Sequence, residues 1–420
     1  MADKKIVING GRKLYGEVCI EGSKNSALAC IAAACLTTDG NEVVLKNIPD
    51  VSDIHVMCEI VRTLGKRVVF EHNMVVISGS FDKCEITSEL AGRLRASTYF
   101  VGVLLADKGK VSCGFPGGDQ IGERPIDIHI AALSKMGAFF STAETIEAKV
   151  NGRLQGQRIY LKYPSVGATC NVILAASRAK GKTVILNAAK EPEIVDLSNL
   201  LVKMGVQIVG AGTDCITVIG SERIQGNVEH EIIPDRIETG FFSVAVAITG
   251  GEVMIKRGIP YHNYSLISVL DEAGVEVIPH EEGVRVKSSG KVKAFHVSMM
   301  PFPGLATDLQ PLMTVMATQA VGTSSIVDYV FQERFQYISQ LQYMGAEVEQ
   351  KGNMLSISGY NKLIGNAVRG NDIRAVSALI CAGLVAEGTT EVEGWYHLHR
   401  GYSNLEQKLQ NLGADIIVKT

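Results

Sequence analysis

The sequence predicts an α/β protein built from six repeats of about 70 residues, grouped as three repeats in each of two domains. Three observations lead to this prediction. A glycine recurs at nearly fixed spacing, a second glycine series runs in step with it, and 420 residues exceed what one hydrophobic core usually supports. A repeat of this length is a supersecondary unit whose apolar faces need neighbours to cover them.

The first glycine series predicts the end of one helix in each repeat. Each glycine follows an amphipathic run and precedes β-branched or alternating residues, which are typical of a strand. Glycine suits this place because a helix often ends in a left-handed residue, which carries no steric cost without a Cβ atom. The series is Gly65, Gly137, Gly205, Gly274, Gly345 and Gly413.

The second glycine series closes an alanine-rich apolar run in each repeat and predicts a second helix end there. With both helices placed, a repeat has the order strand, helix, strand, helix, strand, strand. The series is Gly40, Gly109, Gly181, Gly250, Gly322 and Gly388.

Composition limits the possible partners and locations. The 41 basic and 44 acidic residues give a net charge of −3, so we expect no nucleic-acid or anionic-membrane binding. The apolar run 27–36 is too short to cross a bilayer, and no apolar signal-peptide segment follows Met1. The nine cysteines stand singly, which favours reduced thiols. We therefore expect a cytoplasmic protein without membrane insertion.

The polar residues at the starts of the apolar helices differ from repeat to repeat. Ser, Thr, Asp and Asn are ordinary N-caps. Lys and Arg are not, because a cation near a helix N-terminus opposes the helix dipole, and a bound anion would relieve that cost. These starts predict an anion-binding site and lie at 22–25, 93–97, 165–167, 235–239, 307–308 and 371–374.

Residues 114–125 contain four glycines and two prolines and predict an exposed loop. Such a loop can serve as a lid. The alternative is a long turn in which Asp119 and Arg124 are merely solvated. A further loop, 396–402, places Arg400 before the last helix.

Three motifs that would indicate a nucleotide, metal or dinucleotide site are incomplete or absent. Gly181-Lys182-Thr183 resembles the end of a phosphate-binding loop, but Ala176 stands where its first glycine is required. His397 and His399 have no acidic or cysteine cluster nearby, and no GxGxxG follows a strand. We therefore expect no bound metal and no cofactor.

Four separated segments, 22–27, 116–129, 234–240 and 399–402, together resemble the UDP-N-acetylglucosamine 1-carboxyvinyltransferase family of enolpyruvyl transferases over essentially all 420 residues. The resemblance implies the enolpyruvyl transferase fold, in which six βαβαββ units form two domains of three. It also implies that 23–232 form one domain, which carries the glycine-rich loop, and that 1–22 with 233–420 form the other. The active site is expected in the cleft between them.

The implied reaction moves the enolpyruvyl group of phosphoenolpyruvate to the 3′-hydroxyl of UDP-N-acetylglucosamine and releases phosphate, by addition and elimination and without a cofactor. This is the first committed step of peptidoglycan synthesis. The resemblance thus implies roles in cell-wall biogenesis, cell shape, the cell cycle and cell division.

The resemblance also assigns site residues. The phosphoenolpyruvate clamp is Lys24, Arg124, Arg374 and Arg400, and Asp308 is the base that contacts the sugar hydroxyl. The residues that line the nucleotide-sugar or reaction site are Asn25, Arg95, Pro125, Ile126, Asp127, Ser165, Val166, Gly167 and Val330, together with Lys24, Arg124, Asp308, Arg374 and Arg400.

Asp119 departs from the family pattern, because most members carry a cysteine there as the proton donor. A carboxylic acid can donate a proton only when it is protonated, and nearby arginines oppose this. Lid closure and desolvation would have to overcome that effect. Without the thiolate, the protein is expected to be insensitive to fosfomycin.

Three alternatives remain at this point. The sister enzyme acting on shikimate 3-phosphate shares the fold, but its Gly-Asn-(Ser/Ala)-Gly-Thr motif is absent from the sequence. A paralogue could act on another nucleotide or nucleotide sugar. A non-catalytic UDP-sugar-binding regulator is also conceivable, although it would not need both an anion clamp and a base.

Overall fold

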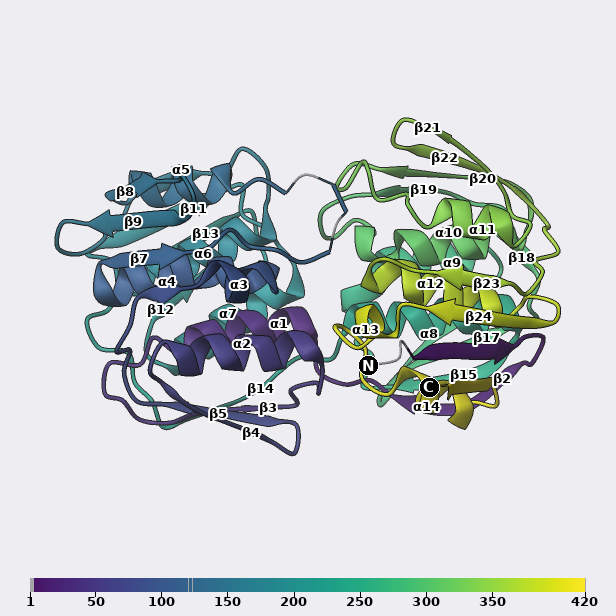
Figure 1. Ribbon diagram of the computed structural model, residues 1–420, viewed down its shortest axis with the longest axis horizontal. Helices are drawn as coiled ribbons and strands as arrows, with labels where there is room; N and C mark the ends of the chain where they lie inside the picture. Colours follow the sequence, from purple (N-terminus) through teal and green to yellow (C-terminus); the bar gives the residue numbers. More distant parts are fainter. Residues whose placement is uncertain (1–3, 120, 123, 420) are drawn as a thin grey trace. The chain divides into compact units, whose positions relative to one another are not determined.

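The computed structural model describes residues 4–119, 121–122 and 124–419, and the chain forms two compact units (Figure 1). The middle unit comprises Gly22–Gly118 and Glu123–Ile233, and the terminal unit comprises Met1–Glu21, Asp119–Gly122 and Pro234–Thr420. The predicted division assigned the whole glycine-rich loop to 23–232. In the structure, Asp119–Gly122 instead group with the terminal unit.

The described strands of the middle unit form three sheets, ordered β14-β3-β5-β4, β6-β7-β9-β8 and β10-β11-β13-β12. The strands are β3 (Val43–Lys46), β4 (Arg67–Glu71), β5 (Met74–Ser78), β6 (Glu85–Ile86), β7 (Lys110–Cys113), β8 (Ala138–Ser141), β9 (Ile146–Val150), β10 (Arg158–Tyr160), β11 (Lys182–Leu186), β12 (Gln207–Val209), β13 (Cys215–Ile219) and β14 (Val228–Glu231). The helices are α1 (Lys24–Ala34), α2 (Ser52–Thr63), α3 (Ser88–Gly92), the 3-10 helix η1 (Arg95–Thr98), α4 (Tyr99–Lys108), α5 (Asp127–Lys135), α6 (Val166–Ala176) and α7 (Pro192–Lys203).

The described strands of the terminal unit form three further sheets, ordered β16-β17-β15-β2, β18-β20-β22-β21 with β19 also on β20, and β23-β24-β1-β25. The strands are β1 (Lys5–Asn9), β2 (Leu14–Cys19), β15 (Gly251–Lys256), β16 (Glu276–His280), β17 (Gly283–Ser288), β18 (Val292–Lys293), β19 (His296–Met299), β20 (Ala320–Asp328), β21 (Glu347–Lys351), β22 (Met354–Gly359), β23 (Ala367–Arg369), β24 (Thr389–Glu393) and β25 (Asp415–Lys419). The helices are α8 (Arg236–Thr249), η2 (Pro260–Asn263), α9 (Tyr264–Glu272), η3 (Thr307–Leu309), α10 (Gln310–Thr318), α11 (Ile338–Tyr343), α12 (Ile373–Gly383), α13 (Trp395–Leu398) and α14 (Leu405–Asn411).

All six sheets share one topology. Two strands pair in parallel, as β6 does with β7; in four of the described sheets a helical segment connects the two, and in the other two sheets the partner comes from a distant part of the chain. An antiparallel pair such as β9 and β8 then completes the sheet. The repeated βαβαββ unit and the α/β class predicted from the sequence are thus confirmed.

Three sheets are completed by strands from distant parts of the sequence, and one of these strands is β1, which pairs antiparallel with both β24 and β25. β14 pairs in parallel with β3, with Val228 opposite Val43, and β2 pairs in parallel with β15, with Leu14 opposite Gly251. α1 follows β2 in sequence but lies in the middle unit, and α8 follows β14 but lies in the terminal unit. The chain passes between the units at both of these places.

The two glycine series behave differently. Every glycine of the first series directly follows a helix C-cap and has a positive φ, from 84° at Gly274 to 103° at Gly65, as predicted. In the second series only Gly109 and Gly250 are C-caps. The helix-end prediction is wrong for the other four, because those helices stop earlier and the glycines lie in the following turn or strand: Gly40, Gly181, Gly322 and Gly388.

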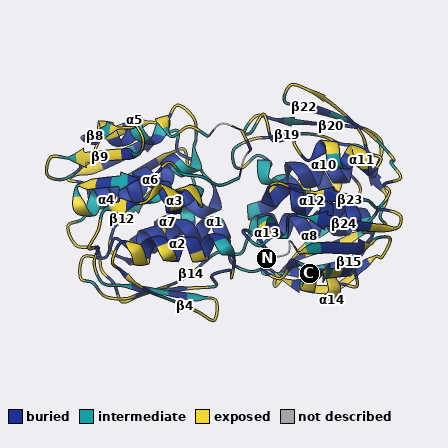
Figure 2. Cartoon of the chain, in the orientation of Figure 1, coloured by how far each residue is buried: buried dark blue, intermediate teal, exposed yellow. Residues whose placement is uncertain are grey.

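The most buried elements of each unit are helices. In α1, every residue except Asn25 is buried, and α1 packs on α7 while α4 packs on α6. Figure 2 shows α1 almost entirely in dark blue, while strands such as β5 and β13 alternate between buried residues and partly or fully exposed ones. A helix that is apolar on all sides is typical of a buried core element. Each unit has its own hydrophobic core.

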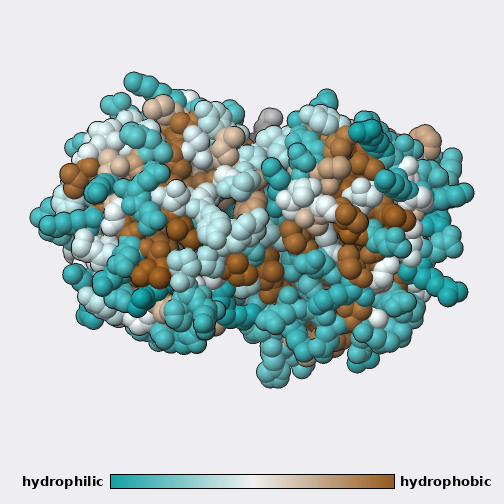
Figure 3. All heavy atoms as spheres, turned by 180° about the vertical axis from the view of Figure 1, so that it is seen from behind, coloured by the Kyte–Doolittle hydropathy of each residue, from teal (hydrophilic) through white to brown (hydrophobic). Residues whose placement is uncertain are grey.

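On the face shown in Figure 3, hydrophilic residues cover most of the surface, and hydrophobic residues gather in small groups on both units. Within residues 4–119, 121–122 and 124–419, no helix has the length and apolar character needed to span a membrane.

Candidate active site

The predicted site residues divide between the two units, and each group is described by itself. The middle unit holds Lys24, Asn25, Arg95, Arg124, Pro125, Ile126, Asp127, Ser165, Val166 and Gly167. The terminal unit holds Asp119, Asp308, Val330, Arg374 and Arg400.

Lys24 is the first residue of α1, whose N-cap Ser23 accepts a hydrogen bond from the Ser26 N–H. The lysine is buried, and its Nζ lies 3.1 Å from Oδ2 of Asp53 in the first turn of α2. A cation at a helix N-terminus opposes the dipole, and Asp53 offsets that cost. Sequence reasoning missed Asp53, because an acidic residue in the first turn of a helix is common without any site.

Arg95 and Arg124 create a positive field at the start of η1. Arg95 Nη2 donates to the Pro125 carbonyl at 3.4 Å. Burial, together with the nearby charge of Arg124, lowers the pKa of Arg95 to about 10. Two guanidinium groups that disfavour each other's charge are stabilised by an anion, so this place suits phosphate groups.

The first half of the glycine-rich loop is packed rather than fully exposed. A Cβ atom at Gly117 would lie 1.7 Å from the Gly92 carbonyl oxygen, so no other residue fits against the end of α3. Phe115 is exposed, whereas Gly114 is buried. The predicted loop therefore has the irregular backbone that was expected, but its described residues are only partly exposed. Gln120 and Glu123 of this loop lie outside the described residues.

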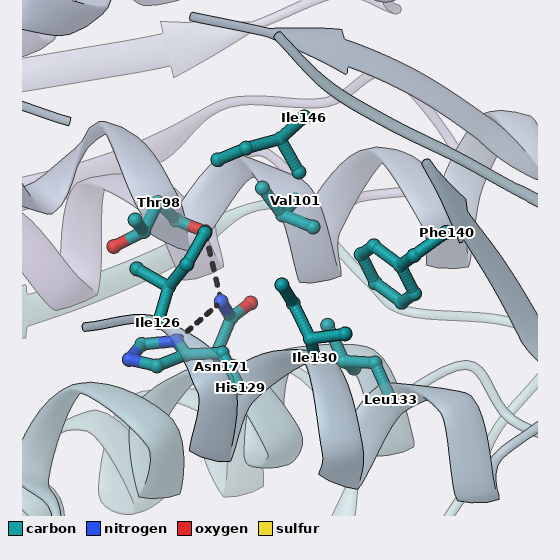
Figure 4. A pocket seen from close by; sticks show the side chains of 9 residues that line it. All are labelled: Thr98, Val101, Ile126, His129, Ile130, Leu133, Phe140, Ile146 and Asn171. Carbon is teal, nitrogen blue, oxygen red and sulfur yellow. Dashed lines mark hydrogen bonds between the residues drawn. The ribbon is translucent and has the colours of Figure 1, made fainter. Parts of the chain in front are cut away.

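α5 and α6 come together at His129 of α5, whose ring lies beside Asn171 of α6 (Figure 4). α5 begins at Asp127, and α6 begins after its N-cap Ser165, whose side chain accepts from the Ala168 N–H. His129 is buried, and a Cβ atom at Gly167 would lie 3.1 Å from its Cε1. Burial lowers the pKa of His129 to about 4, and the charge of Arg95 acts in the same direction. His129 is therefore neutral near pH 7.

In the terminal unit, Asp308 lies between two arginines. Its Oδ1 is 2.9 Å from Arg334 Nη1 and 3.4 Å from Arg374 Nε. Both arginine side chains are almost fully buried, while the Asp308 side chain is 27% exposed. Asp308 is thus a fixed carboxylate that a ligand hydroxyl can still reach. Arg334 was not predicted, because it lies outside any recognisable helix start.

Arg374 lies at the start of α12, where Asp372 caps the helix by accepting from the N–H groups of Arg374 and Ala375. Burial alone would lower the pKa of Arg374, but surrounding acidic groups, Asp308 first among them, raise it above its ordinary value. The guanidinium therefore stays charged despite its burial, and it can still meet an anionic group.

Asp328, which sequence reasoning missed, positions two predicted site segments. It ends β20 and is fully buried. Its Oδ1 accepts from the Val330 N–H at 2.8 Å, and its Oδ2 accepts from the Thr307 hydroxyl at 2.7 Å. Thr307 precedes Asp308 in η3, so Asp328 holds the Val330 backbone and the side chain of the residue next to Asp308.

Asp119 and Arg400 form an ion pair within the terminal unit. Their side chains are 12% and 9% exposed, respectively. Two residues predicted for different roles, proton donor and anion clamp, are thus bonded to each other. His397 lies near this pair: burial lowers its pKa, while the charge of Asp119 opposes that effect.

The helix start at 235–239 has a structural role in addition to any binding role. Asp235 caps α8 by accepting from the Ile237 and Glu238 N–H groups. Glu238 is buried, accepts from the Glu21 N–H at 3.1 Å and lies 2.5 Å from Lys408 Nζ. These contacts tie α8 to the chain segment that leaves β2.

A buried group in the middle unit has the residue types of a metal site. Cys30, Asp196 and His230 lie within reach of one another. Asp196, however, accepts hydrogen bonds from the Ser26 hydroxyl at 2.5 Å, His230 Nε2 at 2.8 Å and the Ile233 N–H at 3.3 Å. Burial raises the pKa of Cys30, which keeps its thiol protonated. The group is therefore a hydrogen-bonded core network.

Comparison with known proteins matches the chain over nearly its whole length. The family profile described as EPSP synthase (3-phosphoshikimate 1-carboxyvinyltransferase) matches residues 8–409. The chain is 45% identical over 414 residues, covering 98% of the chain and 99% of the relative, to UDP-N-acetylglucosamine 1-carboxyvinyltransferase of Halothermothrix orenii. It is 44% identical over 416 residues, covering 99% of each, to UDP-N-acetylglucosamine 1-carboxyvinyltransferase 1 of Caldanaerobacter subterraneus subsp. tengcongensis.

Solved structures share the fold. The enolpyruvyl transferase NikO from Streptomyces tendae superposes with a TM-score of 0.88 at 23% identity, covering 100% of this chain and 99% of that one. An EPSP synthase from Acinetobacter baumannii superposes with a TM-score of 0.79 at 18% identity, covering 100% of both chains. At these identities the likeness establishes the two-unit fold and nothing about the substrate.

Proposed function

We infer the activity from the fact that the chain belongs to the UDP-N-acetylglucosamine 1-carboxyvinyltransferase family of enolpyruvyl transferases. It transfers the enolpyruvyl group of phosphoenolpyruvate to the 3′-hydroxyl of UDP-N-acetylglucosamine and releases phosphate. The observation that carries the proposal is full-length identity of 44–45% to relatives with this name. It is combined with buried arginines that flank Asp308 in the terminal unit.

Phosphoenolpyruvate carries a phosphate and a carboxylate, and the proposed clamp supplies matching cations. Lys24 and Arg124 of the middle unit and Arg374 and Arg400 of the terminal unit take this role. Arginine suits it because its fork of donors matches carboxylate and phosphate oxygens. Lys24 is paired with Asp53 and Arg400 with Asp119, so a bound anion would compete with or join these pairs.

The proposed chemistry has an addition and an elimination. In the addition, C3 of phosphoenolpyruvate gains a proton and the sugar oxygen bonds to C2, while that oxygen loses its proton to Asp308. In the elimination, C3 returns a proton to Asp119 and the bond from C2 to the phosphate oxygen breaks, which gives the enol ether and phosphate, while the proton held by Asp308 leaves with the phosphate or to water. Asp308 suits the base role because it is partly exposed and acts as an acceptor held by Arg334 and Arg374.

Asp119 is the proposed proton donor to C3. Its ion pair with Arg400 holds it as a hydrogen-bond acceptor, so donation requires that substrate binding weakens this pair and that Asp119 gains a proton. When Arg400 turns to the anionic substrate, the pair is broken, and Asp119 can then take a proton from water before it donates one to C3. The glycine-rich loop that carries Asp119 is the element proposed to move.

The nucleotide sugar is proposed to bind mainly to the middle unit. Its residues there are Asn25, Arg95, Arg124, Pro125, Ile126, Asp127, Ser165, Val166 and Gly167, with Val330 of the terminal unit. Supporting this, Arg95 and Arg124 form a positive field, and Ser165–Gly167 form the N-terminal turn of α6, whose backbone N–H groups favour a diphosphate. That the two units enclose the substrates together stays a prediction.

The product is proposed to enter peptidoglycan synthesis in the cytoplasm, where nucleotide-activated sugars are made. Loss of the protein would then impair cell-wall biogenesis, cell shape and division. Depletion in a growing culture tests this: cells that keep their shape and wall content would contradict it.

A direct test incubates the protein with both substrates and looks for the enolpyruvyl sugar nucleotide by mass spectrometry. We expect the product with the native chain and its loss in Lys24→Met. Lys46→Met is the control, because Lys46 is exposed and pairs with Glu229 on the surface. An equally active Lys24→Met variant would remove Lys24 from the clamp, and absence of product with the native chain would overturn the activity.

A further inference from the structure

A small pocket in the middle unit holds a polar amide among apolar side chains (Figure 4). The amide belongs to Asn171 of α6, which is fully buried. A buried amide without partners is costly, so its contacts reveal what holds it there. The pocket is lined by Thr98, Val101, Ile126, His129, Ile130, Leu133, Phe140, Ile146 and Asn171.

Asn171 satisfies its amide with groups from two other helical segments. Its Nδ2 donates to the Thr98 carbonyl oxygen at 2.8 Å, and its Oδ1 accepts from the Gly102 N–H at 2.8 Å. These are the carbonyl and N–H groups that the first turn of an α-helix would pair with each other. The Asn171 amide thus bridges the junction of η1 and α4.

The second N–H of the same amide reaches His129. Asn171 Nδ2 lies 3.0 Å from His129 Nδ1. The orientation of the amide is fixed, because Gly102 N–H can only donate and the Thr98 carbonyl can only accept. His129 Nδ1 must therefore accept, and the single proton of the neutral ring lies on Nε2.

The three segments joined by Asn171 are those that carry the proposed nucleotide-sugar residues. η1 begins at Arg95, and the Thr98 hydroxyl also bonds the Arg95 carbonyl at 3.0 Å. His129 follows Asp127 in the first turns of α5, and Asn171 follows Ser165–Gly167 in α6. One side chain thus connects three binding segments.

The packing is tight on the side of this amide that faces Gly102 and on the side of His129 that faces Gly167. A Cβ atom at Gly102 would lie 2.2 Å from Asn171 Oδ1, and one at Gly167 would lie 3.2 Å from His129 Nε2. A shift of Asn171 therefore displaces α4 or the His129 ring directly, and through them the segments that bear the binding residues.

We propose, on the premise of the function proposed above, that Asn171 is a positioning residue for the nucleotide-sugar site: it fixes the starts of η1, α5 and α6 relative to one another and holds His129 as the Nε2-protonated neutral ring. Asn171 does not contact the substrate in this account. It acts through Arg95, Asp127 and Ser165–Gly167.

The test compares Asn171→Leu and the milder Asn171→Asp with the native chain. The aspartate keeps the acceptor for the Gly102 N–H and removes both donors. Each variant is assayed for phosphate release and, by calorimetry, for binding of UDP-N-acetylglucosamine. We expect KM and Kd for the nucleotide sugar to rise at least tenfold, while KM for phosphoenolpyruvate stays within about twofold.

The matched control is Val172→Ala, which opens a cavity at the next, fully buried residue of α6 without touching the amide. If Asn171 had only a structural role, variants at Asn171 and Val172 that lower the melting temperature equally would change KM for the nucleotide sugar equally. If the Asn171 variants change KM for the nucleotide sugar no more than a Val172→Ala variant of equal melting temperature, the inference is overturned.

A measurement on the native chain does not depend on how the variants fold. The ¹⁵N signals of His129 are expected to report an unprotonated Nδ1 and a protonated Nε2 near pH 7. A proton on Nδ1 would contradict the network. Failure of the native chain to bind the nucleotide sugar would overturn the proposed function as well, whereas native binding with unaffected variants overturns the positioning role alone.

Discussion

Arg400 donates a hydrogen bond from Nη1 to Oδ1 of Asp119, although 281 positions separate the two residues in the chain. The pair is largely shielded from water, since neither side chain is more than 12% exposed. A buried charge pair is costly to break by removing one partner. The proposed proton donor and one cation of the proposed clamp therefore form one buried ion pair, and we predict that substrate binding changes this pair.

We predict that fosfomycin does not inactivate this enzyme covalently. The epoxide needs a strong nucleophile, and position 119 offers a carboxylate that is bonded to Arg400 instead of a thiolate. Activity after preincubation is expected to stay constant with time, whereas Asp119→Cys is expected to lose activity progressively. A mass increase on the Asp119 peptide of the native enzyme would refute this.

The pH profile tests the acid role of Asp119. A carboxylic acid donor loses its proton at lower pH than a thiol does, so native activity is expected to fall from mildly acidic to alkaline pH more steeply than that of Asp119→Cys. Rates at saturating substrate, measured across this range for both forms, provide the comparison. If the pH–rate profiles of the native enzyme and Asp119→Cys are parallel, Asp119 is not the proton donor.

We predict that Asp308→Asn lowers kcat by about 10²- to 10⁴-fold, the usual contribution of a general base. The amide oxygen can still accept from Arg334 and Arg374, so KM for the nucleotide sugar is expected to change by no more than a few-fold. Steady-state kinetics measure both constants. A native kcat in Asp308→Asn would remove Asp308 as the base.

We predict that Glu238 makes the stability of the protein depend on pH. Burial raises the pKa of Glu238 to about 7, although Lys408 pulls it downward. The pKa of Glu238 in the folded chain lies above the value of about 4.3 expected in the unfolded chain. The stability that Glu238 contributes is therefore fully present below about pH 4.3 and is lost as the pH rises through about 7. The loss is on the order of 3 kcal/mol.

Glu238→Gln is therefore expected to flatten the change in unfolding free energy between pH 5 and 8, as measured by urea titration. Glu272→Gln is the control, because Glu272 is exposed at the end of α9 in the same unit. If Glu238→Gln and the native chain show the same pH dependence, the buried carboxyl is not its cause.

The repeated frame could be predicted from the sequence because its signal is periodic. A glycine directly follows a helix C-cap in every repeat, so it recurs in the sequence at a regular spacing. All six glycines of that series adopt a positive φ. The second series was misleading in four repeats, because glycine also serves turns and strand starts, and composition alone does not separate these uses.

The partners of the site residues could not be predicted. Asp53, Asp328 and Arg334 look like ordinary helix-start, strand-end and loop residues in the sequence, and only the fold shows what they hold. Asn171 is similar: it lies within an apolar helix, and its three partners come from 42 to 73 positions away. Such contacts depend on tertiary packing, which has no period.

The most direct test of the account is phosphate release from phosphoenolpyruvate with UDP-N-acetylglucosamine, with shikimate 3-phosphate or with no acceptor. We expect steady turnover with UDP-N-acetylglucosamine and only background release in the other two reactions. Turnover with shikimate 3-phosphate in its place, or no turnover with any acceptor, would contradict it.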